Sequence, residues 1–139
     1  MTNNFFLDTN IVIDILLSRK PFFETSVQLF HYAEKNKVKL CISALSYWNI
    51  YYVIKKVNSR QETISIIKNL NNYLTAVDVT QKIITQSINS LFSDFEDAIQ
   101  YYSALTLGNV TAIVTRNGKD FKQSDIAVMT PEQALALII

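Results

Sequence analysis

The sequence comprises 139 residues with a net charge of +1, and it is 49% hydrophobic and 18% charged, with only 2 Gly and 2 Pro. This composition excludes a disordered or fibrous chain, and the small net charge gives no global electrostatic argument for nucleic-acid binding. A chain of this length can bury a substantial core, so we expect one helix-rich domain over residues 1–139.

Neither a membrane segment nor a disulfide is expected. No apolar run reaches the roughly 18 residues that a spanning helix requires, and the polar N-terminus lacks the basic start of a signal peptide. The one cysteine, Cys41, cannot pair within the chain, which favours a reducing compartment. We therefore expect a cytoplasmic protein that does not bind membranes.

Short apolar runs alternate with segments in which apolar residues recur at helical spacing, and this pattern predicts strands that alternate with helices. Strands are expected over residues 4–7, 39–42, 76–79, 111–114 and 127–129. The helices are expected to carry their apolar positions over residues 11–16, 22–33, 44–56, 66–73, 83–91 and 95–105 and after residue 130. Such alternation is typical of an α/β domain whose parallel sheet is covered by helices on both faces.

Several helix starts carry recognisable capping residues. Ser43 and Thr80 are expected to cap the helices that follow them. Residues 59–62 and 93–96 both have the Ser-x-x-Glu pattern of a capping box. Thr130 precedes a proline and stands three residues before a glutamine, which predicts the start of the last helix.

Large apolar side chains recur along two of the predicted helices. Over residues 44–56 we expect Leu45, Trp48 and Tyr52 to face the core. Tyr47 and Tyr51 are then left to form a partner-binding surface. In the helix after residue 93, the side chains expected to be buried are Phe95, Ala98, Ile99, Tyr102 and Leu105.

Polar residues follow the predicted strands at the points where the strands end. Asp8 lies directly after the first strand, and a carboxylate so close to an apolar run is costly to bury unless it is paired or metal-bound. Because the carboxyl ends of parallel strands meet at one edge of a sheet, we expect such residues to converge there. The candidate site residues are Asp8, Thr9, Asn10, Ser43, Asn49, Asp94, Asp97, Thr115, Arg116, Asn117 and Asp120.

The donor types in this set indicate a site for a hard cation. Carboxylates with hydroxyl and amide neighbours, and no set of histidines or cysteines, suit Mg²⁺ or Mn²⁺ rather than zinc. Such an ion would attract a phosphate group and lower the pKa of a bound water. A structural interpretation is also available for Asp94 and Asp97, because both lie in the first turn of a helix, where the dipole favours negative charge. Asp14 is interpreted as a solvated or helix-pairing acid, and Glu96 as a capping residue.

Four polar segments are spread over nearly the whole chain. They are Phe6-Leu7-Asp8-Thr9-Asn10, Ile42-Ser43-Ala44-Leu45-Ser46, Asp94-Phe95-Glu96-Asp97-Ala98 and Thr115-Arg116-Asn117-Gly118-Lys119-Asp120-Phe121. In order and spacing they resemble the PIN-domain ribonucleases, in particular the VapC-like toxins of bacterial toxin–antitoxin pairs. The resemblance implies a three-layer α/β/α sandwich with a five-stranded parallel sheet and Mg²⁺- or Mn²⁺-dependent hydrolysis of single-stranded RNA. It also implies a homodimer or higher oligomer and inhibition by a cognate antitoxin.

The resemblance also implies roles for individual residues. Asp8, Asp97 and Asp120 match the acidic positions of the family, which makes them candidate catalytic and metal-binding residues. Thr9 and Thr115 match hydroxyl positions near the metal.

One position departs from the family's pattern. The family usually has a glutamate in the helix after the second strand, where this sequence has Asn49. An amide oxygen is a weaker ligand than a carboxylate and carries no charge. Asp94, one turn before Asp97, is expected to compensate as a fourth catalytic and metal-binding acid.

Two other functions compete with an endoribonuclease. The first is a PIN-fold module that binds RNA or a protein partner but cleaves poorly, which Asn49 would explain. The second is a phosphoacceptor receiver domain, which also places acids at strand ends. Receiver domains normally pair two acids after the first strand and place a lysine after the last strand. Here Asp8 is followed by Thr9, and the fifth strand ends at Thr130, so this alternative is disfavoured.

Overall fold

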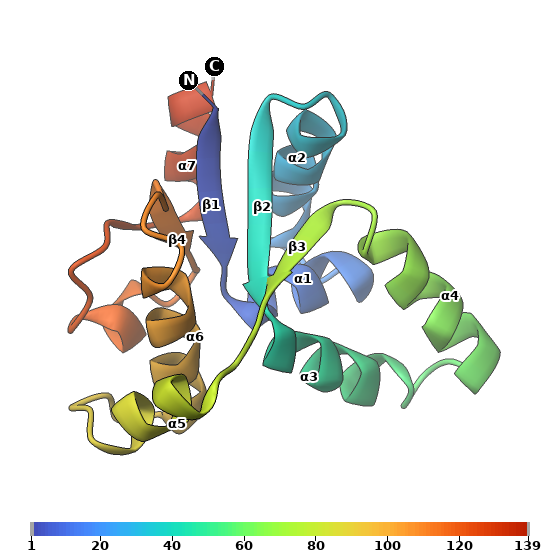
Figure 1. The fold of residues 1–139 in the computed structure, drawn as a ribbon. Helices are drawn as coiled ribbons and strands as arrows, with labels where there is room; N and C mark the ends of the chain where they lie inside the picture. The colour runs from blue at the N-terminus through green and yellow to red at the C-terminus, as the bar shows by residue number, and fades with distance from the viewer. Residues whose placement is uncertain (1, 139) are drawn as a thin grey trace.

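The computed structural model describes residues 2–138, within which five parallel strands form one sheet (Figure 1). The strands lie in the order β3-β2-β1-β4-β5, so the first strand occupies the centre. Their bounds are β1 (Asn3–Leu7), β2 (Val38–Ser43), β3 (Leu74–Val77), β4 (Ala112–Val114) and β5 (Val128–Met129). The predicted α/β class with a five-stranded parallel sheet is therefore confirmed.

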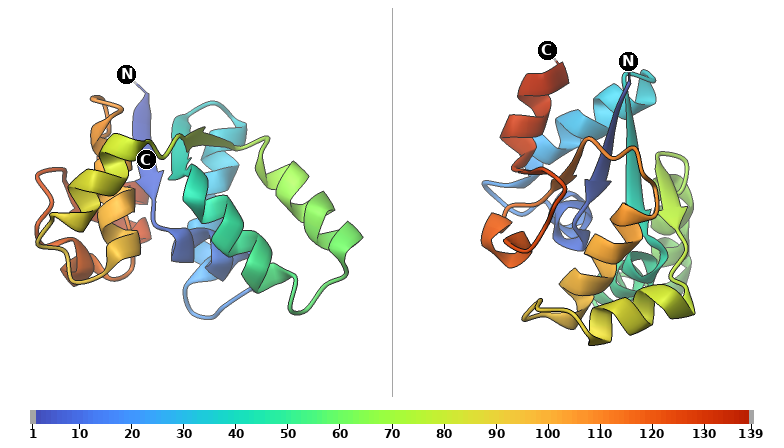
Figure 2. Two further views of the ribbon diagram at one scale, coloured as in Figure 1. Left: turned by 60° about the horizontal axis from the view of Figure 1, so that its bottom comes forward. Right: turned by 60° about the vertical axis from the view of Figure 1, so that its left-hand side comes forward.

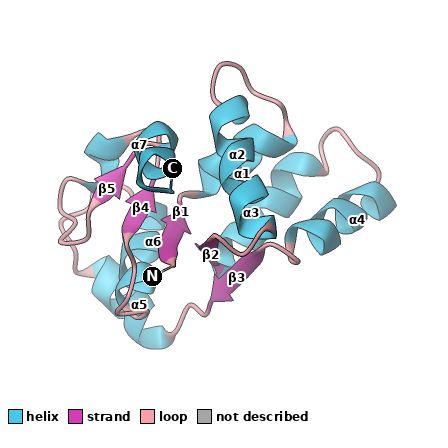
Figure 3. Cartoon of the chain, turned by 90° about the horizontal axis from the view of Figure 1, so that it is seen from above, coloured by secondary structure: helices cyan, strands magenta, loops and turns pink. Residues whose placement is uncertain are grey.

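Helices cover both faces of the sheet, which produces the predicted three layers (Figures 2 and 3). Figure 3 looks down on the sheet and places α2 and α7 on one side and α5 on the other. The bounds are α1 (Thr9–Leu16), α2 (Phe23–Glu34), α3 (Ala44–Ile54), α4 (Arg60–Leu70), α5 (Gln81–Ile88), α6 (Phe95–Leu105) and α7 (Pro131–Ile138), with a 3-10 helix η1 (Gly118–Phe121). Among residues 2–138, no helix has the length and apolar character needed to cross a membrane.

The central strand β1 joins two hydrophobic cores, because alternate residues of a strand point to opposite faces. Phe5 and Leu7 pack in the core that includes residues of α1, α2, α3 and α7. Phe6 packs in the second core, with Tyr101 of α6 and Phe121 of η1. A strand buried on both faces requires a continuous apolar run, which is why β1 could be predicted from the sequence.

The third strand lies two residues earlier than predicted. β3 runs over Leu74–Val77 rather than 76–79, and its last residue pairs with Ser43 at the end of β2. The preceding helix ends at Leu70 rather than at residue 73, and α5 ends at Ile88 rather than at residue 91. Residues 118–121, which follow β4, form the 3-10 helix η1.

The predicted caps of α3, α4, α5 and α7 are confirmed by side-chain hydrogen bonds to the backbone. The predicted capping box at residues 93–96 is wrong. α6 is capped one residue later by Asp94, whose Oδ1 accepts a hydrogen bond from the backbone N–H of Asp97 at 3.0 Å. The carboxylate of Glu96 is therefore not used by a cap and is available to another partner.

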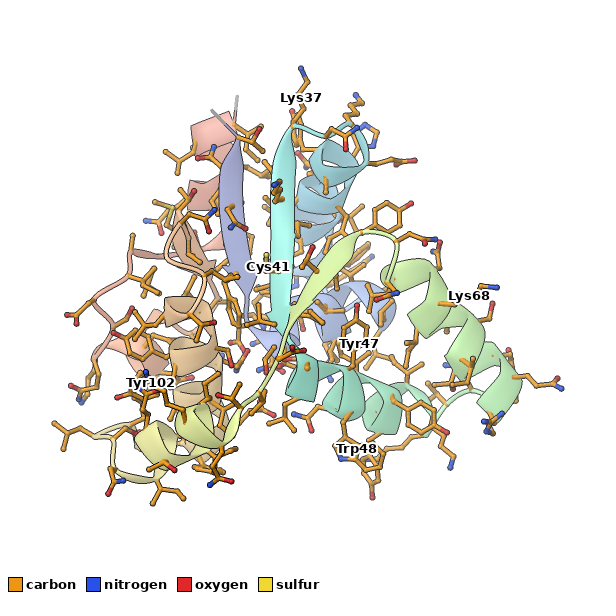
Figure 4. The ribbon with its side chains drawn as sticks, viewed as in Figure 1. Lys37, Cys41, Tyr47, Trp48, Lys68 and Tyr102 are labelled. Atoms are coloured by element: carbon orange, nitrogen blue, oxygen red, sulfur yellow. The ribbon has the colours of Figure 1, made fainter. Side chains whose placement is uncertain are left out.

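The predicted core faces of α3 and α6 are also wrong. In α3 the buried residues are Ser46, Ile50 and Ile54, whereas Trp48 is 60% exposed (Figure 4) and Tyr52 is 58% exposed. The reason is that the buried face of α3 begins with a polar contact, from Ser46 to the start of α1, which hydrophobic spacing does not reveal. In α6, Tyr101 replaces Tyr102 as the buried tyrosine, and the two exposed members of the predicted set are Phe95 and Leu105.

Candidate active site

The sheet has a topological switch point between β1 and β4. From β1 the strand order runs one way through β2 and β3 and the other way through β4 and β5. Ligands of open α/β sheets bind in the crevice at the carboxyl ends of the strands at such a point. Leu7 pairs with Val114 at the ends of β1 and β4, so the next residues, Asp8 and Thr115, lie side by side there.

Asp8 is held by hydrogen bonds to both of its carboxylate oxygens. Thr115 Oγ1 donates to Oδ2 at 2.8 Å, and Gln100 Nε2 donates to Oδ1 at 3.2 Å. Asp8 is only 4% exposed, and burial raises its pKa, an effect that these two hydrogen bonds oppose and that the charge of Asp120 reinforces. The carboxylate is thus fixed in position at the edge of the sheet, and within residues 2–138 it forms no ion pair.

Gln100 is a site residue that sequence reasoning did not identify. Its side chain joins the first residue of α1 to Asp8. Gln100 Oε1 accepts a hydrogen bond from the backbone N–H of Thr9 at 3.0 Å, and Gln100 Nε2 donates one to Asp8 Oδ1. Thr9 Oγ1 lies 2.7 Å from Ser46 Oγ, which ties α1 to α3. The contacts of Thr9 and Gln100 therefore join α1, α3 and α6 beside Asp8.

Asp97 is the most perturbed acid of the chain that the structure describes. Burial and then the charges of Asp94, Asp8, Asp120 and Glu96 raise the pKa of Asp97 to about 7. The charges of the other three predicted aspartates therefore act on Asp97, and Gln100, which contacts Asp8, lies one turn after Asp97 in α6. The first turn of α6 supplies two of the four aspartates, as expected from its sequence.

Asn49 lies at this edge and contacts an acid that was assigned another role. Its Nδ2 donates a hydrogen bond to Glu96 Oε2 in the first turn of α6. Burial and then the charges of Asp8 and Asp94 raise the pKa of Glu96, so this side chain belongs to the acidic group and is not a capping residue. The position at which a glutamate was expected therefore has a carboxylate beside it, supplied from a different helix.

The other predicted site residues differ in their exposure and contacts. Asp94 is exposed and caps α6, and Asp120 is exposed on η1. Ser43 is buried as the cap of α3, and the backbone of Asn10 hydrogen-bonds Asp8. The backbone N–H of Asn117 donates to Thr115 Oγ1 at 3.1 Å, which orients the hydroxyl that contacts Asp8.

Arg116 does not reach the acidic group. Its Nε donates to Asp14 Oδ2 at 2.8 Å and its Nη2 to Asp14 Oδ1 at 3.3 Å, while its guanidinium lies 4.2 Å from the ring centroid of Phe22. The interpretation of Asp14 as a solvated acid is wrong, because its side chain is fully buried and also pairs with Arg19. A buried carboxylate needs such partners.

The chemistry of the donors fits a hard divalent cation, while their arrangement is open. The donors at the edge are carboxylates and hydroxyls. Cys41, the one thiol of the sequence, is buried in the core on the face of the sheet opposite α1. Within residues 2–138, however, no three Asp, Glu, His or Cys side chains are grouped so that they could hold one ion. Mg²⁺ commonly binds through one or two protein carboxylates and keeps several waters. The assignment of Asp8, Asp94, Asp97 and Asp120 as metal ligands stays a prediction.

Comparison with known proteins gives concordant results. A sequence model of the PIN domain matches residues 4–119. Ribonuclease VapC1 of Aquifex aeolicus is 29% identical over 133 residues, which cover 92% of this chain and 90% of that protein.

Solved structures share the fold over nearly their whole length. VapBC-1 from nontypeable Haemophilus influenzae aligns with a TM-score of 0.67 at 16% identity, covering 93% of this chain and 98% of that one. A toxin–antitoxin complex from Klebsiella pneumoniae aligns with a TM-score of 0.65 at 24% identity, covering 91% and 96%.

Proposed function

The chain belongs to the PIN domain family, and on that premise we propose that it is a metal-dependent endoribonuclease that cleaves single-stranded RNA, acting as the toxin of a toxin–antitoxin pair. The observation that carries this proposal is the group of carboxylates around Asp97 at the switch point of the sheet. A similar protein is named a ribonuclease, and a structural neighbour is a toxin–antitoxin complex, which supports the reaction class and the biological role.

The chemistry follows from what the side chains can do. Asp8 is held as a hydrogen-bond acceptor by Thr115 and Gln100, so its carboxylate is ready to accept a cation without reorganisation. Burial and neighbouring carboxylates raise the pKa of Asp97 to about 7 in the metal-free protein, so a cation bound there would hold Asp97 as the deprotonated carboxylate. Bound Mg²⁺ or Mn²⁺ would supply phosphate binding and a more acidic water.

A second candidate function is a PIN-fold module that binds RNA or a protein but cleaves poorly. The open arrangement of the acids within residues 2–138 and the amide of Asn49 favour it. The carboxylate of Glu96 beside Asn49 favours the nuclease, because it restores a negative charge at the position that lacks the glutamate.

The antitoxin needs a surface on this chain, and we assign it to an apolar groove between α1, α2 and α4. The groove has a volume of about 320 Å³ and is lined mostly by aliphatic and aromatic side chains. Such a groove accepts the apolar face of an amphipathic helix. Tyr47, which is predicted to lie on the partner surface, donates from its hydroxyl to Asn71 Oδ1 at 2.9 Å and links α3 to the end of α4.

We assign the second copy of a homodimer to the exposed apolar side chains between α5 and α6. Ile88 is 66% exposed, and Leu91 and Phe95 are also exposed around the connection between the two helices. Their burial against the same surface of another copy would remove apolar area from water.

The lone buried thiol of Cys41 also suits a reducing compartment such as the cytoplasm.

Cleavage of a fluorogenic single-stranded RNA tests the proposed function. The purified protein should cut it with Mn²⁺ and should leave duplex DNA intact. Asp8→Asn, Asp97→Asn and Asp120→Asn should each lower kcat by at least roughly a hundredfold, the effect typical of losing one acid–base group, without unfolding the protein. Asp125→Asn, which removes an exposed acid outside the group, is the matched control. Wild-type cleavage by all three variants would mean that the site lies elsewhere or that the activity is a contaminant.

A further inference from the structure

Both ion pairs within residues 2–138 meet at one carboxylate, that of Asp14 in α1. Its side chain is fully buried. Arg116 donates from Nε to Asp14 Oδ2 at 2.8 Å and from Nη2 to Oδ1 at 3.3 Å, whereas Arg19 donates only from Nη1, to Oδ1 at 3.4 Å. A contact through two donors fixes the direction of an arginine as well as its distance. The guanidinium of Arg116 therefore has a defined orientation against α1.

This contact links α1 to the segment that carries Thr115. Arg116 directly follows Thr115 in residues 115–117, which connect β4 to η1. Thr115 Oγ1 donates to Asp8 Oδ2 at 2.8 Å, and Asp8 directly precedes α1. Asp14 lies six positions after Asp8, about 9 Å along a helix axis. Residues 115–117 are thus joined to the α1 region at two separate points, by a hydrogen bond at Asp8 and by an ion pair at Asp14.

The guanidinium of Arg116 is held on a second side by an aromatic ring. It lies 4.2 Å from the ring centroid of Phe22, a distance at which a cation is attracted to the face of a ring. Asp14 neutralises the charge of Arg116 at contact distance. Arg116 is therefore suited to act on the acidic edge through the position of its own backbone.

Two other roles of Arg116 fit these contacts less well. A direct contact with a phosphate would require the guanidinium to leave Asp14, and a buried carboxylate would then have only the longer contact with Arg19. Stability alone is also a weak reason for the pair, because apolar residues of similar volume often replace a buried ion pair without loss. The ion pair differs from an apolar contact in that it fixes a direction.

We propose that Asp14 and Arg116 are positioning residues whose ion pair holds residues 115–117 against α1, so that the hydroxyl of Thr115 keeps the carboxylate of Asp8 in its orientation at the carboxyl edge of the sheet. This assignment rests on the proposed function for the cation that Asp8 would bind. Partners that orient a metal-binding side chain typically contribute roughly tenfold to a hundredfold to metal affinity. Because Arg116 acts through Thr115, we expect its contribution at the lower end of that range.

Hydrogen exchange of the Asn117 amide in the metal-free protein tests the positioning directly. This amide donates to Thr115 Oγ1 at 3.1 Å, so its protection from exchange requires the hydroxyl to stay in place. Arg116→Met removes the ion pair and keeps a long side chain. The variant should lose the protection of the Asn117 amide, measured by NMR in chelator.

The matched control is Arg19→Met, which removes the other partner of Asp14 from a residue that is not attached to Thr115. This control should keep the protection of the Asn117 amide. The amide of Asp8, which donates to the carbonyl of Val114 at 2.9 Å, should stay protected in both variants and so shows that both are folded.

Calorimetric titration of Mn²⁺ provides the second test. Arg116→Met should weaken Mn²⁺ binding roughly tenfold, whereas Arg19→Met should bind as the wild type does. Thr115→Val removes the hydroxyl itself, so the double variant Thr115→Val/Arg116→Met should lose no more affinity than Thr115→Val alone. Additive losses would overturn the proposal, because Arg116 would then not act through the hydroxyl of Thr115.

An apolar replacement of the pair separates positioning from stability. Asp14→Leu/Arg116→Met should melt at a higher temperature than Arg116→Met, because it leaves no buried carboxylate without its partner. It should nevertheless bind Mn²⁺ roughly tenfold more weakly than the wild type, because the directional contact is lost. This variant also supplies the test if Arg116→Met does not fold.

Three further results would overturn the positioning role. They are an Asn117 amide that stays protected in Arg116→Met, wild-type Mn²⁺ affinity in the apolar double variant, and a raised KM for RNA at unchanged kcat and Mn²⁺ affinity in Arg116→Met, which would make Arg116 a substrate-binding residue. A wild-type protein that binds no Mn²⁺ would contradict the proposed function, and hydrogen exchange of the Asn117 amide would then decide the positioning role by itself.

Discussion

The ionisation of Asp97 depends on the neighbouring carboxylates at the carboxyl edge of the sheet. Burial and neighbouring carboxylates raise the pKa of Asp97 to about 7, well above the ordinary value of an unfolded carboxyl near roughly 4. In the metal-free protein, the contribution of Asp97 to the free energy of unfolding is fully present below about pH 4 and is lost as the pH rises through about 7. Above that pH the carboxyl of Asp97 is ionised in the folded state too, where burial and the neighbouring carboxylates disfavour its charge.

Asp97→Asn should therefore stabilise the metal-free protein at mildly alkaline pH. The amide mimics the protonated acid, so the melting temperature of the variant should fall less than that of the wild type between about pH 4 and pH 8. Melting curves in chelator measure this, with Asp125→Asn as the control for loss of an exposed acid. A variant that melts below the wild type with the same pH dependence would show that Asp97 is not repelled by its neighbours.

The contact of Asn49 with Glu96 predicts a second effect of charge. Asn49→Glu should tighten Mn²⁺ binding and lower metal-free stability, because a carboxylate would replace the amide that now donates to Glu96. The double variant Asn49→Glu/Glu96→Gln keeps the charge count and should recover metal-free stability. Calorimetric Mn²⁺ titration and melting measure the two effects. Unchanged Mn²⁺ affinity in a folded Asn49→Glu protein would place this position outside the site.

At the residue scale, the position of Asp8 at the end of a strand could be predicted, whereas the side chains that support it could not. Asp8 could be predicted because it follows an apolar strand directly. Gln100 could not, because a glutamine within a helix gives no local signal and its partner, Asp8, lies 92 positions away in the sequence. Asp14 was misassigned for the same reason, since its partner Arg116 is 102 positions away.

At the scale of elements, α6 presents its first turn to the site, and its cap and its charge are separable. Asp94→Asn should keep the cap, because asparagine caps as well as aspartate does, but should lower Mn²⁺-dependent cleavage if the charge serves the site. Asp94→Ala should lower cleavage and also destabilise the protein by about 1 kcal/mol. Chemical denaturation and cleavage rates distinguish the two. An Asp94→Asn protein with full activity would make Asp94 a cap only.

Elements were predicted where local signals are strong and misplaced where tertiary contacts decide. The capping box of α4 and the apolar run of β1 are local, and both are confirmed. The face of α3 depends on Ser46 reaching Thr9 across the fold, so its aromatic spacing indicated the wrong side. The third strand shifted because its register with β2 fixes where it ends.

At the scale of the whole molecule, topology brings the acids together. Asp8, Asp97 and Asp120 come from three distant parts of the chain, and the reversal of strand order between β1 and β4 is what places them at one edge. The order of strands and helices could be predicted from the sequence, which is why the edge was predicted. The openness of the acidic group depends on side-chain positions that the sequence does not encode locally.

A cation site formed by Asp8, Asp94, Asp97 and Asp120, as proposed above, requires deprotonated Asp97. Calorimetric titration of Mn²⁺ at about pH 6.5, in buffers of different ionisation enthalpy, tests it most directly, because metal binding must displace the proton that Asp97 holds there. The account predicts saturable binding with release of up to about one proton per ion, with both effects abolished by Asp97→Asn. An absence of binding, or binding whose proton release Asp97→Asn leaves unchanged, would contradict it.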